Sequence, residues 1–348
     1  MGNPVYNYSL NQGIYKSGWK YYRGDFHAHS DYSDGHIRFS DIPTYMNNQR
    51  MDFIAMTEHN TLPFVLPNQK HLFIPSFELT LPKGHMNVHG IDQPPTRDLM
   101  TYMDCSINTL LDNFKGDTNI SINHMFMDPW EFQMIELDLS MVNTIEVICD
   151  PTYPTASKAN DKAVAFLDFL WDKGIHLYGI GGSDCHLTIE ERYEGANEPS
   201  VYGDPGTYVY AKNLSSKCII DSVKKGMTYV SRYCELDIDI NQGETQLGQR
   251  VEGNKLNYEI MIRPFQDVST EGWQGLMIMD GRIIEKFDLG HTQHCKWSAE
   301  LDSSVYHWIR FGIYDSNHHV LCYVNPVYCG AKKVDTYRLK DLLKEFNL

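Results

Sequence analysis

The chain has 348 residues, of which 42% are hydrophobic, and 30 basic against 45 acidic residues give it a formal net charge of −15. This composition is typical of a globular protein and excludes a mainly disordered chain. The acidic balance argues against binding of duplex nucleic acid or of an anionic membrane through bulk electrostatics. A phosphorylated substrate stays open, because bound cations would invert the local field.

The sequence contains no recognisable targeting or membrane-spanning segment. The initial stretch MGNPVYNYSLNQG lacks a basic n-region and an apolar h-region, and no apolar run approaches the ~20 residues of a membrane helix. The eight cysteines include no C-x-x-C pair, so neither a zinc ribbon nor a disulfide framework is indicated. We therefore expect a cytoplasmic protein with reduced thiols, and the sequence leaves its oligomeric state open.

Seven apolar runs in the first two-thirds of the chain predict buried strands, because their apolar residues run together rather than strictly alternate. These runs cover residues 20–27, 51–59, 71–79, 85–91, 118–124, 143–150 and 175–184. Helical patterns at 41–50, 97–114 and 157–173 lie between several of them. Strands separated by helices predict parallel crossovers, and hence an α/β barrel or an open sheet.

The pattern changes after about residue 235. Strand-like runs joined by turn signals follow at 235–240, 256–263, 275–280, 282–289, 305–315 and 319–328, and a helical pattern returns only at 335–346. We therefore expect two domains. Residues 1–235 would form the α/β domain, and residues 236–348 a mostly antiparallel, β-sandwich-like domain with a terminal helix.

Polar residues gather where the predicted strands end. They are His27, His29, Glu58, His59, Glu78, His124, Asp184 and His186. Singly each is most simply a core or surface residue, but five strands repeat the placement, and the carboxyl ends of barrel strands converge on one face. Imidazole and carboxylate are ligands of zinc, manganese and iron. The ligand count, with Glu78 able to bridge two cations, predicts two or three divalent metal ions.

In this order, the segments HAHSDYSDG, TEHN, FEL, GHMNVHG, INH and GGSDCH resemble the motifs of the PHP family, named for polymerase and histidinol phosphatase. The resemblance covers about residues 18–232. It implies a distorted seven-stranded (β/α) barrel with a trinuclear metal centre that hydrolyses phosphoesters. The metal ligands that it implies are His27, His29, Asp34, His59, Glu78, His85, His124, Asp184 and His186.

Two features of this chain depart from the family pattern. Glu58, directly before His59, stands where the family usually has an aspartate. His36 and His89 also lie close to Asp34 and His85 in the sequence, and they stay open as replacement ligands.

The function expected from the resemblance is hydrolysis of a small phosphorylated or nucleotide substrate. Cations would lower the pKa of bound water to about 7, and Asp184 and His186 would orient the attacking water. Arg192 would clamp the phosphate with its planar fork, with Arg23 as a second choice.

Two alternatives stay open at this point. The first is a carbamate or carboxylic-ester hydrolase on the same metal site, which a fainter resemblance over residues 205–232 and the following β domain indicates. The second is a binding or regulatory module without turnover. Urease-like amidohydrolases also begin with H-x-H, but they close with a lone aspartate, whereas this chain closes with D-x-H.

Overall fold

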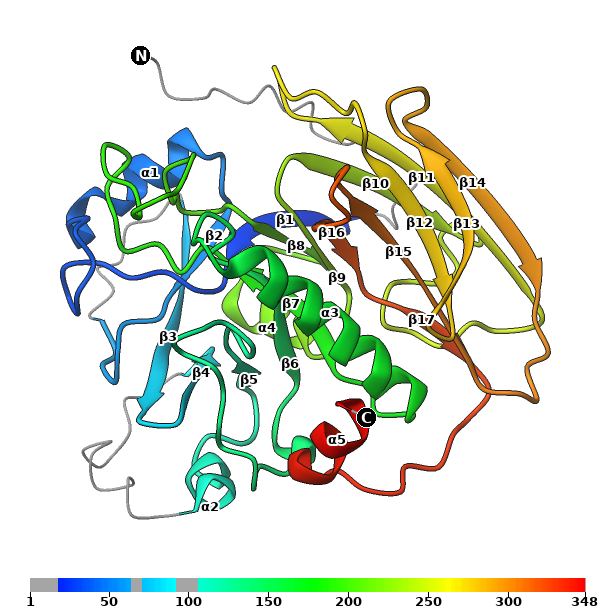
Figure 1. The fold of residues 1–348 in the computed structure, drawn as a ribbon, viewed down its shortest axis with the longest axis horizontal. Coiled ribbons are helices and arrows are strands. Elements are labelled where there is room, and N and C mark those ends of the chain that lie inside the picture. Colours follow the sequence, from blue (N-terminus) through cyan, green and yellow to red (C-terminus); the bar gives the residue numbers. More distant parts are fainter. Residues whose placement is uncertain (1–17, 64–70, 92–105, 348) are drawn as a thin grey trace.

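The computed structural model describes residues 18–63, 71–91 and 106–347. The seven strands predicted in the first part of the chain are all present, and they follow one another in a single sheet (Figure 1). They are β1 (Lys20–Asp25), β2 (Phe53–Met56), β3 (Leu72–Leu81), β4 (Gly84–His89), β5 (Asn119–Ile122), β6 (Thr144–Cys149) and β7 (Tyr178–Gly182). The fold is mixed α/β, as the alternation of strands and helices predicts.

Strand β4 departs from the parallel arrangement of the other strands in this part of the sheet. The pairs β1–β2, β2–β3, β5–β6 and β6–β7 are parallel, but β4 runs antiparallel to both β3 and β5. The cause is the two-residue turn at 82–83, which is too short for the crossover that a parallel pair needs. As a consequence His85, at the start of β4, lies opposite Thr80, near the carboxyl end of β3.

The segments that follow β1 and β7 join the two ends of this part of the sheet. Ala28 and Cys185 form a parallel bridge, and the amide of Asp184 donates to the carbonyl of His27 at 2.8 Å. The sheet therefore closes at the carboxyl ends of its strands. The expected count of seven barrel strands stays a prediction, because β8 (Gly206–Ala211) also pairs with β1 and carries the sheet further.

The helices begin and end close to the predicted positions where the chain is described. They are α1 (Ile42–Asn48), α2 (Ile107–Asp112), α3 (Ala156–Asp172), α4 (Ser216–Val223) and α5 (Leu339–Phe346), with short 3₁₀ turns at Phe39–Asp41 and Leu139–Met141. The helix expected at 97–114 appears as α2, and its part before residue 106 lies outside the described residues. Helix α4 has no counterpart in the sequence prediction. In the described part of the chain, no helix has the length and apolarity required to cross a membrane.

The C-terminal strands pair in antiparallel fashion and lie in two sheets. Strands β16 (Val320–Val324), β15 (His307–Tyr314), β12 (Gln274–Met279) and β13 (Arg282–Asp288) extend the first sheet beyond β9 (Thr228–Ser231), and β17 (Val327–Cys329) pairs with β15. Strands β10 (Cys234–Ile240), β11 (Lys255–Pro264) and β14 (His294–Glu300) form the second. Leu236 and Ile260 of the second sheet share one buried cluster with Phe311 of the first. The mostly antiparallel region is thus present, and a domain boundary at residue 235 stays a proposal.

Helix α3 connects the β region to the first part of the chain. Its apolar residues Leu167, Leu170 and Trp171 are buried, and the helix lies against β6 (Figure 1). Carboxylates on another face of α3 bind β15 and β16. Asp168 accepts two hydrogen bonds of 2.7 Å from Arg310, while Asp161 accepts from the amide of Val320 at 2.9 Å. These bonds hold the C-terminal strands in place against the helix.

Candidate metal centre

The backbone turns sharply at the ends of three parallel strands. His124, Asp150 and Asp184 follow β5, β6 and β7, and their φ angles are +26°, +37° and +49°. Residues other than glycine rarely adopt this left-handed region, and such backbone occurs preferentially at functional sites. The turns place these polar side chains at one common end of the sheet.

Glu78 is the centre of the cluster, and its side chain is 1% exposed. Five imidazoles lie around its carboxylate. The nitrogens of His59, His85, His27, His124 and His29 lie at 2.7, 3.2, 3.3, 3.6 and 3.7 Å from one of its two oxygens. A single buried carboxylate within reach of so many imidazoles is a candidate metal ligand.

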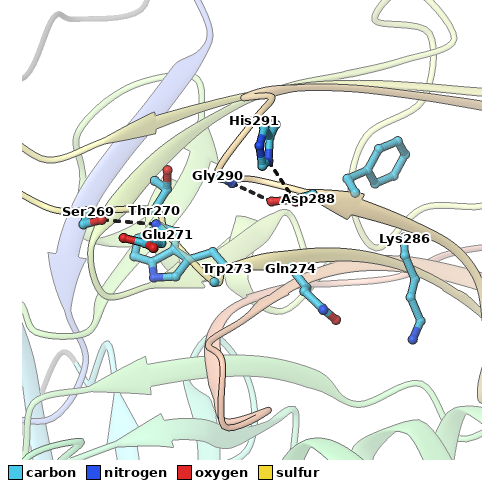
Figure 2. Close-up of a pocket in the computed structure, with 11 residues that line it drawn as sticks. Ser269, Thr270, Glu271, Trp273, Gln274, Lys286, Asp288, Gly290 and His291 are labelled. Atoms are coloured by element: carbon cyan, nitrogen blue, oxygen red, sulfur yellow. Dashed lines mark hydrogen bonds and ion pairs between the residues drawn. The ribbon is translucent and has the colours of Figure 1, made fainter.

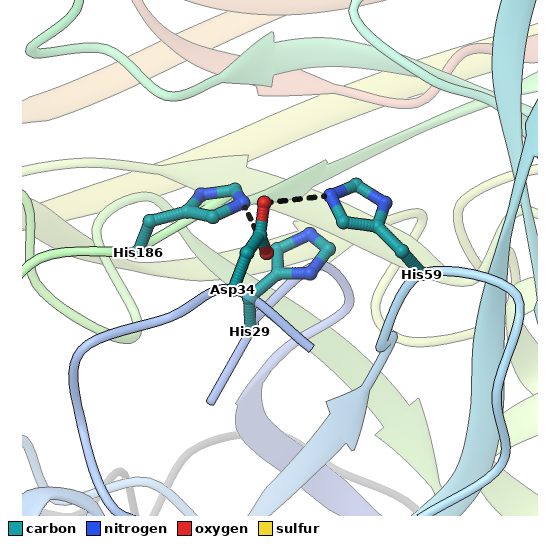
Figure 3. Close-up of side chains that lie close together, drawn as sticks. All are labelled: His29, Asp34, His59 and His186. Carbon is teal, nitrogen blue, oxygen red and sulfur yellow. Dashed lines mark ion pairs between the residues drawn. The ribbon is translucent and has the colours of Figure 1, made fainter. Parts of the chain in front are cut away.

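A second part of the cluster lies nearer to solvent. The carboxylate of Asp34 lies between the rings of His59 and His186, with His29 close to them (Figure 3). Its oxygens are 3.4 Å from Nε2 of His59 and 3.3 Å from Nε2 of His186. Asp34 comes from the loop after β1, and the two histidines follow β2 and β7. The three side chains therefore meet only because the strands converge.

The third part contains the H-x-H pair. The Nε2 atoms of His27 and His29 are 3.1 Å apart, and each is 3.1 Å from Oδ1 of Asp184. All nine ligands implied by the motifs lie in four overlapping groups whose donor atoms are within 4.8 Å of one another. In the described residues, these groups also contain Cys149. Burial raises the pKa of the Cys149 thiol well above its usual value, which disfavours the thiolate that a metal would require.

The two histidines that were open as replacement ligands lie elsewhere. The Nε2 atom of His89 is 2.8 Å from the carbonyl of Phe26, and its Nδ1 atom is 3.0 Å from the amide nitrogen of Asn119. Burial lowers the pKa of His89 to about 3, so the ring is neutral. His36 is exposed and pairs with Glu191 at 2.9 Å. Neither ring is in the groups of donor atoms, so the geometry favours Asp34 and His85.

Several buried polar residues support the cluster, and the sequence pattern identifies only Glu58 among them. Nδ1 of His27 lies 2.8 Å from Glu146, and the side-chain amide of Asn123 donates to Glu78 at 2.8 Å. Glu58 accepts hydrogen bonds from the hydroxyls of Ser30 and Ser33 and so holds the loop that carries Asp34. The only sequence signal for Glu146 was a charged residue inside the apolar run TIEVIC.

Two glycines allow the backbone to pack against the H-x-H segment. A Cβ atom on Gly182 would lie 2.3 Å from Cβ of His27, and one on Gly35 would lie 2.8 Å from the backbone of His29. Real Cβ atoms do not approach so closely. The glycines of GGSD and SDG are therefore required for the close approach of these segments.

The shifted pKa values of the cluster indicate that its carboxylates favour positive charge close to them. Burial disfavours protonation of His59, yet hydrogen bonds to Asp34 and Glu78 outweigh burial and raise its pKa to about 10. For His186, hydrogen bonding to Asp34 likewise overcomes burial and raises the pKa to about 9. Burial opposes ionisation of Glu78, but the neighbouring His27 and His124 hold its pKa well below the usual value.

Divalent cations fit this environment. Cations satisfy the same carboxylates without protonating the imidazoles, and the donor set of imidazoles and carboxylates is the one that zinc, manganese and iron accept. The tautomers also fit, since Nδ1 of His27 can donate to Glu146 and that of His186 to the carbonyl of Asp184 at 2.8 Å. In both rings Nε2 is then free to bind a metal.

The two arginines considered as phosphate clamps bind backbone carbonyls. Arg192 is exposed, and its guanidinium donates to the carbonyl of Asn197 at 2.6 Å. Arg23 is buried and donates to the carbonyls of Gln49 and Gly203. Arg23 therefore has a structural role between loops, whereas the clamp role of Arg192 stays a prediction.

A separate cavity lies in the β region (Figure 2). Its volume is about 680 Å³, and it is lined by residues 269–274 and by residues near the end of β13. His291 and Asp288, which pair at 2.9 Å, lie on its wall. In the described residues, no group of three metal-binding side chains includes these two, so this cavity is distinct from the candidate metal centre.

Comparison with known proteins gave no matching family model and no matching curated protein. Solved structures with a similar fold include a two-domain protein from Bacteroides vulgatus that contains a predicted PHP-like metal-dependent phosphoesterase. It is 16% identical, with a TM-score of 0.46, over 92% of this chain and 99% of that chain.

Two other solved structures cover about half of this chain. A candidate metal-dependent phosphoesterase from Bifidobacterium adolescentis is 13% identical with a TM-score of 0.32, over 52% of this chain and 92% of its own. An amidohydrolase from Chromobacterium violaceum, with bound sulfate and no metal, is 14% identical with a TM-score of 0.35, over 48% and 89%. Proteins described as metal-dependent phosphoesterases thus recur among the similar structures. At these scores the likeness carries no argument about activity, which must rest on the site itself.

Proposed function

We propose that this chain is a metal-dependent hydrolase, and specifically a phosphoesterase acting on a small phosphorylated substrate. The observation that carries the proposal is Glu78, a buried carboxylate with five imidazoles within 3.7 Å. The proposed ligands fall into three neighbouring sites. We assign His27, His29, Glu78 and Asp184 to the first, Glu78, His85 and His124 to the second, and Asp34, His59 and His186, with His29 close to them, to the third.

The chain's own residues have distinct roles in this proposal. Bound zinc, manganese or iron would supply a water that ionises near neutral pH and would neutralise charge on the ester oxygens. Glu78 would offer its two oxygens to adjacent sites. Asp184 and His186 orient the attacking water. The side chain of His186 is 24% exposed, so this proposed ligand lies on the side of the cluster that a substrate can reach.

One observation favours a second candidate, a carboxylic-ester or carbamate hydrolase on the same site. Phosphate dianions are commonly bound by arginine, but Arg192 and Arg23 donate to backbone carbonyls. An ester with less charge needs no such clamp. The phosphoester is still preferred, because two or three cations provide the charge that a phosphate requires. We also propose that the protein is cytoplasmic, and this inference rests on its sequence alone.

The test combines metal analysis with a substrate panel. Protein purified with manganese, zinc or iron is assayed for metal content and for turnover of phosphate monoesters, carboxylic esters and carbamates. We expect bound metal and phosphate release, both lost in Glu78→Gln and retained in Glu136→Gln, a surface variant. Ester or carbamate turnover without phosphate release would replace the first candidate by the second. Metal binding with no turnover of any substrate would favour a binding module.

A further inference from the structure

Three aromatic side chains form a row that begins beside the proposed metal ligands. The ring centroid of Trp130 lies 6.4 Å from that of His124 and 5.1 Å from that of Tyr153. Tyr153 in turn lies 5.2 Å from Tyr193. The three rings come from different loops, since Trp130 follows β5, Tyr153 follows β6 and Tyr193 follows β7. We call Trp130, Tyr153 and Tyr193 the aromatic row.

The exposure of Trp130 sets it apart from an ordinary core residue. Its relative exposure is 41%, whereas Trp171, Trp273 and Trp308 are at most 7% exposed. Packing within the fold therefore accounts for only part of its surface. Tryptophan is enriched in binding sites because it provides a large, rigid contact surface at little cost in conformational entropy. An exposed indole next to a catalytic centre is a candidate for contact with the substrate.

Hydrogen bonds fix the loops that carry the aromatic row. The hydroxyl of Thr155 donates to the carbonyl of Asp128 at 3.0 Å and joins the loops after β5 and β6. The amide of Tyr153 donates to the carbonyl of Asp150 at 2.9 Å, and the hydroxyl of Tyr193 hydrogen-bonds the carboxyl of Asp150. The rings are thus positioned before any ligand binds, which lowers the entropic cost of a stacking contact.

We propose that the aromatic row is the wall of the active site that receives the substrate's leaving group, and that it stacks on a planar ring there. The inference rests on the proposed function and narrows it to esters whose leaving group carries an aryl or nucleobase ring. An ester held at the His124 side of the metal centre has its leaving group directly beside the indole. A ring stacks there, whereas a short alkyl group leaves the indole in water.

The test compares substrates with and without a ring in matched variants. Phenyl phosphate and a nucleoside 5′-monophosphate are compared with glycerol phosphate in the wild type, Trp130→Leu and Trp130→Phe. We expect Trp130→Leu to lower kcat/KM for the two ring substrates roughly three- to tenfold, mostly through KM, with glycerol phosphate changed less than twofold. Trp130→Phe, which keeps a planar ring, should restore most of the loss.

The control is Tyr337→Leu, which removes an aromatic ring of 40% exposure in the segment before α5. It should leave all three substrates unchanged. Melting temperatures establish that the variants are folded. Equal losses on ring and alkyl substrates in Trp130→Leu, or no loss on either, overturn the proposal. A loss on phenyl phosphate without one on the nucleotide identifies an aryl leaving group, and the reverse identifies a nucleobase.

A parallel series with phenyl acetate and ethyl acetate separates this inference from the phosphoesterase proposal. Variant-to-wild-type ratios are compared, which cancels the different intrinsic reactivity of the leaving groups. If only acetates are hydrolysed, the phosphoesterase proposal fails, while a selective loss on phenyl acetate in Trp130→Leu still supports the aromatic row. If no ester is hydrolysed, the test is made on binding instead. Calorimetry then compares the affinities of phenylphosphonate and methylphosphonate for the metal-loaded wild type and Trp130→Leu, and we expect only the affinity for phenylphosphonate to fall in the variant. Equal affinities in wild type and variant overturn the inference.

Discussion

The Nδ1 atom of His27 lies 2.8 Å from Oε1 of Glu146, and both side chains are completely buried beneath the proposed metal centre. The other carboxylate oxygen of Glu146 accepts a hydrogen bond of 2.9 Å from the backbone amide of His124. One carboxylate thus fixes two proposed ligands. By accepting the Nδ1 hydrogen of His27, it directs the free Nε2 atom towards Glu78 and Asp184, where a cation would bind.

We predict that Glu146→Gln weakens metal binding about 10- to 100-fold, the range found when groups that orient metal ligands are removed. Glutamine keeps the size of the side chain but is a poorer acceptor for the His27 hydrogen. Competition with a chelating dye measures the affinity directly. Glu136→Gln, at an exposed glutamate that pairs with Lys340, serves as the control. Equal affinities in the two variants would show that Glu146 does not orient His27.

The close packing at Gly182 leads to a second prediction. In Gly182→Ala the new methyl group would be 2.3 Å from Cβ of His27 and 2.6 Å from its backbone nitrogen. Because a backbone atom cannot yield as a side-chain tip does, we expect metal content to fall sharply and stability to drop by about 1–3 kcal/mol. In the control Gly290→Ala the nearest atom is the carboxylate of Asp288 at 3.2 Å. Metal content and urea unfolding are measured, and a fully loaded Gly182→Ala protein would contradict the prediction.

Removal of metal should destabilise the fold. The carboxylates of Asp34, Glu78 and Asp184 lie among imidazoles at one end of the sheet, and cations that bind only the folded state stabilise it by mass action. We expect chelation to lower the melting temperature and manganese or zinc to restore it, with about 2.7 kcal/mol gained at a metal concentration 100 times Kd. The same titration on Glu78→Gln should give a much smaller shift. Identical melting curves with and without chelator would refute the metal centre.

The sequence was sufficient to predict the strands that carry the site and the residues at their ends. Buried strands produce continuous apolar runs, and a histidine or carboxylate at the end of such a run is visible without a structure. Convergence then follows from the barrel, which is why residues as distant as Asp34 and His186 could be placed together. Their distance of 3.3 Å agrees with that expectation, while their role as ligands stays a proposal.

The supporting residues could not be predicted, because their partners are distant in the sequence and follow no periodicity. Glu146 and His27 are 119 positions apart. The sequence around Glu146 shows only a single charged residue inside an apolar strand and gives no sign of its partner. The reversed direction of β4 does not follow from the apolar runs, because the overall alternation of strands and helices favours parallel pairs and only the two-residue turn at 82–83 indicates an antiparallel one. Edge strand β14 was missed as well, since most of its residues are at least partly exposed.

The ion pair between Asp168 and Arg310 leads to a prediction about stability. The Arg310 side chain is 1% exposed, and two hydrogen bonds of 2.7 Å attach it to Asp168 on α3. Replacing Asp168 by Ala leaves a buried guanidinium without its counter-charge, which costs about 3–5 kcal/mol. The control Lys173→Ala removes an exposed ion pair, since the side chains of Lys173 and Glu345 are 40% and 47% exposed. This change should lower the free energy of unfolding by less than about 1 kcal/mol. Urea unfolding compares the two, and a similar small loss in both would contradict the anchoring role of α3.

Glu235 on β10 provides a prediction for pH dependence. Burial raises its pKa to about 7, and the repulsion from Asp237 adds to this, while Arg23 and Arg263 oppose it. The guanidinium of Arg263 is bound to Asp237 at 2.8 Å, which limits its help to Glu235. The folded state thus holds the Glu235 proton more tightly than the unfolded chain, whose glutamates ionise near pH 4.3.

Stability contributed by protonated Glu235 is therefore lost as pH rises from about 4.3 to 7, and the loss is complete above pH 7. Glu235→Gln removes the titration, so we expect it to be more stable than wild type by about 1–3 kcal/mol at pH 8 and nearly equal to it at pH 4.3. Urea unfolding at the two pH values measures the difference. Glu252→Gln, at an exposed position, should show no such change with pH. A gain from Glu235→Gln that is the same at both pH values would mean that packing, rather than ionisation, is responsible.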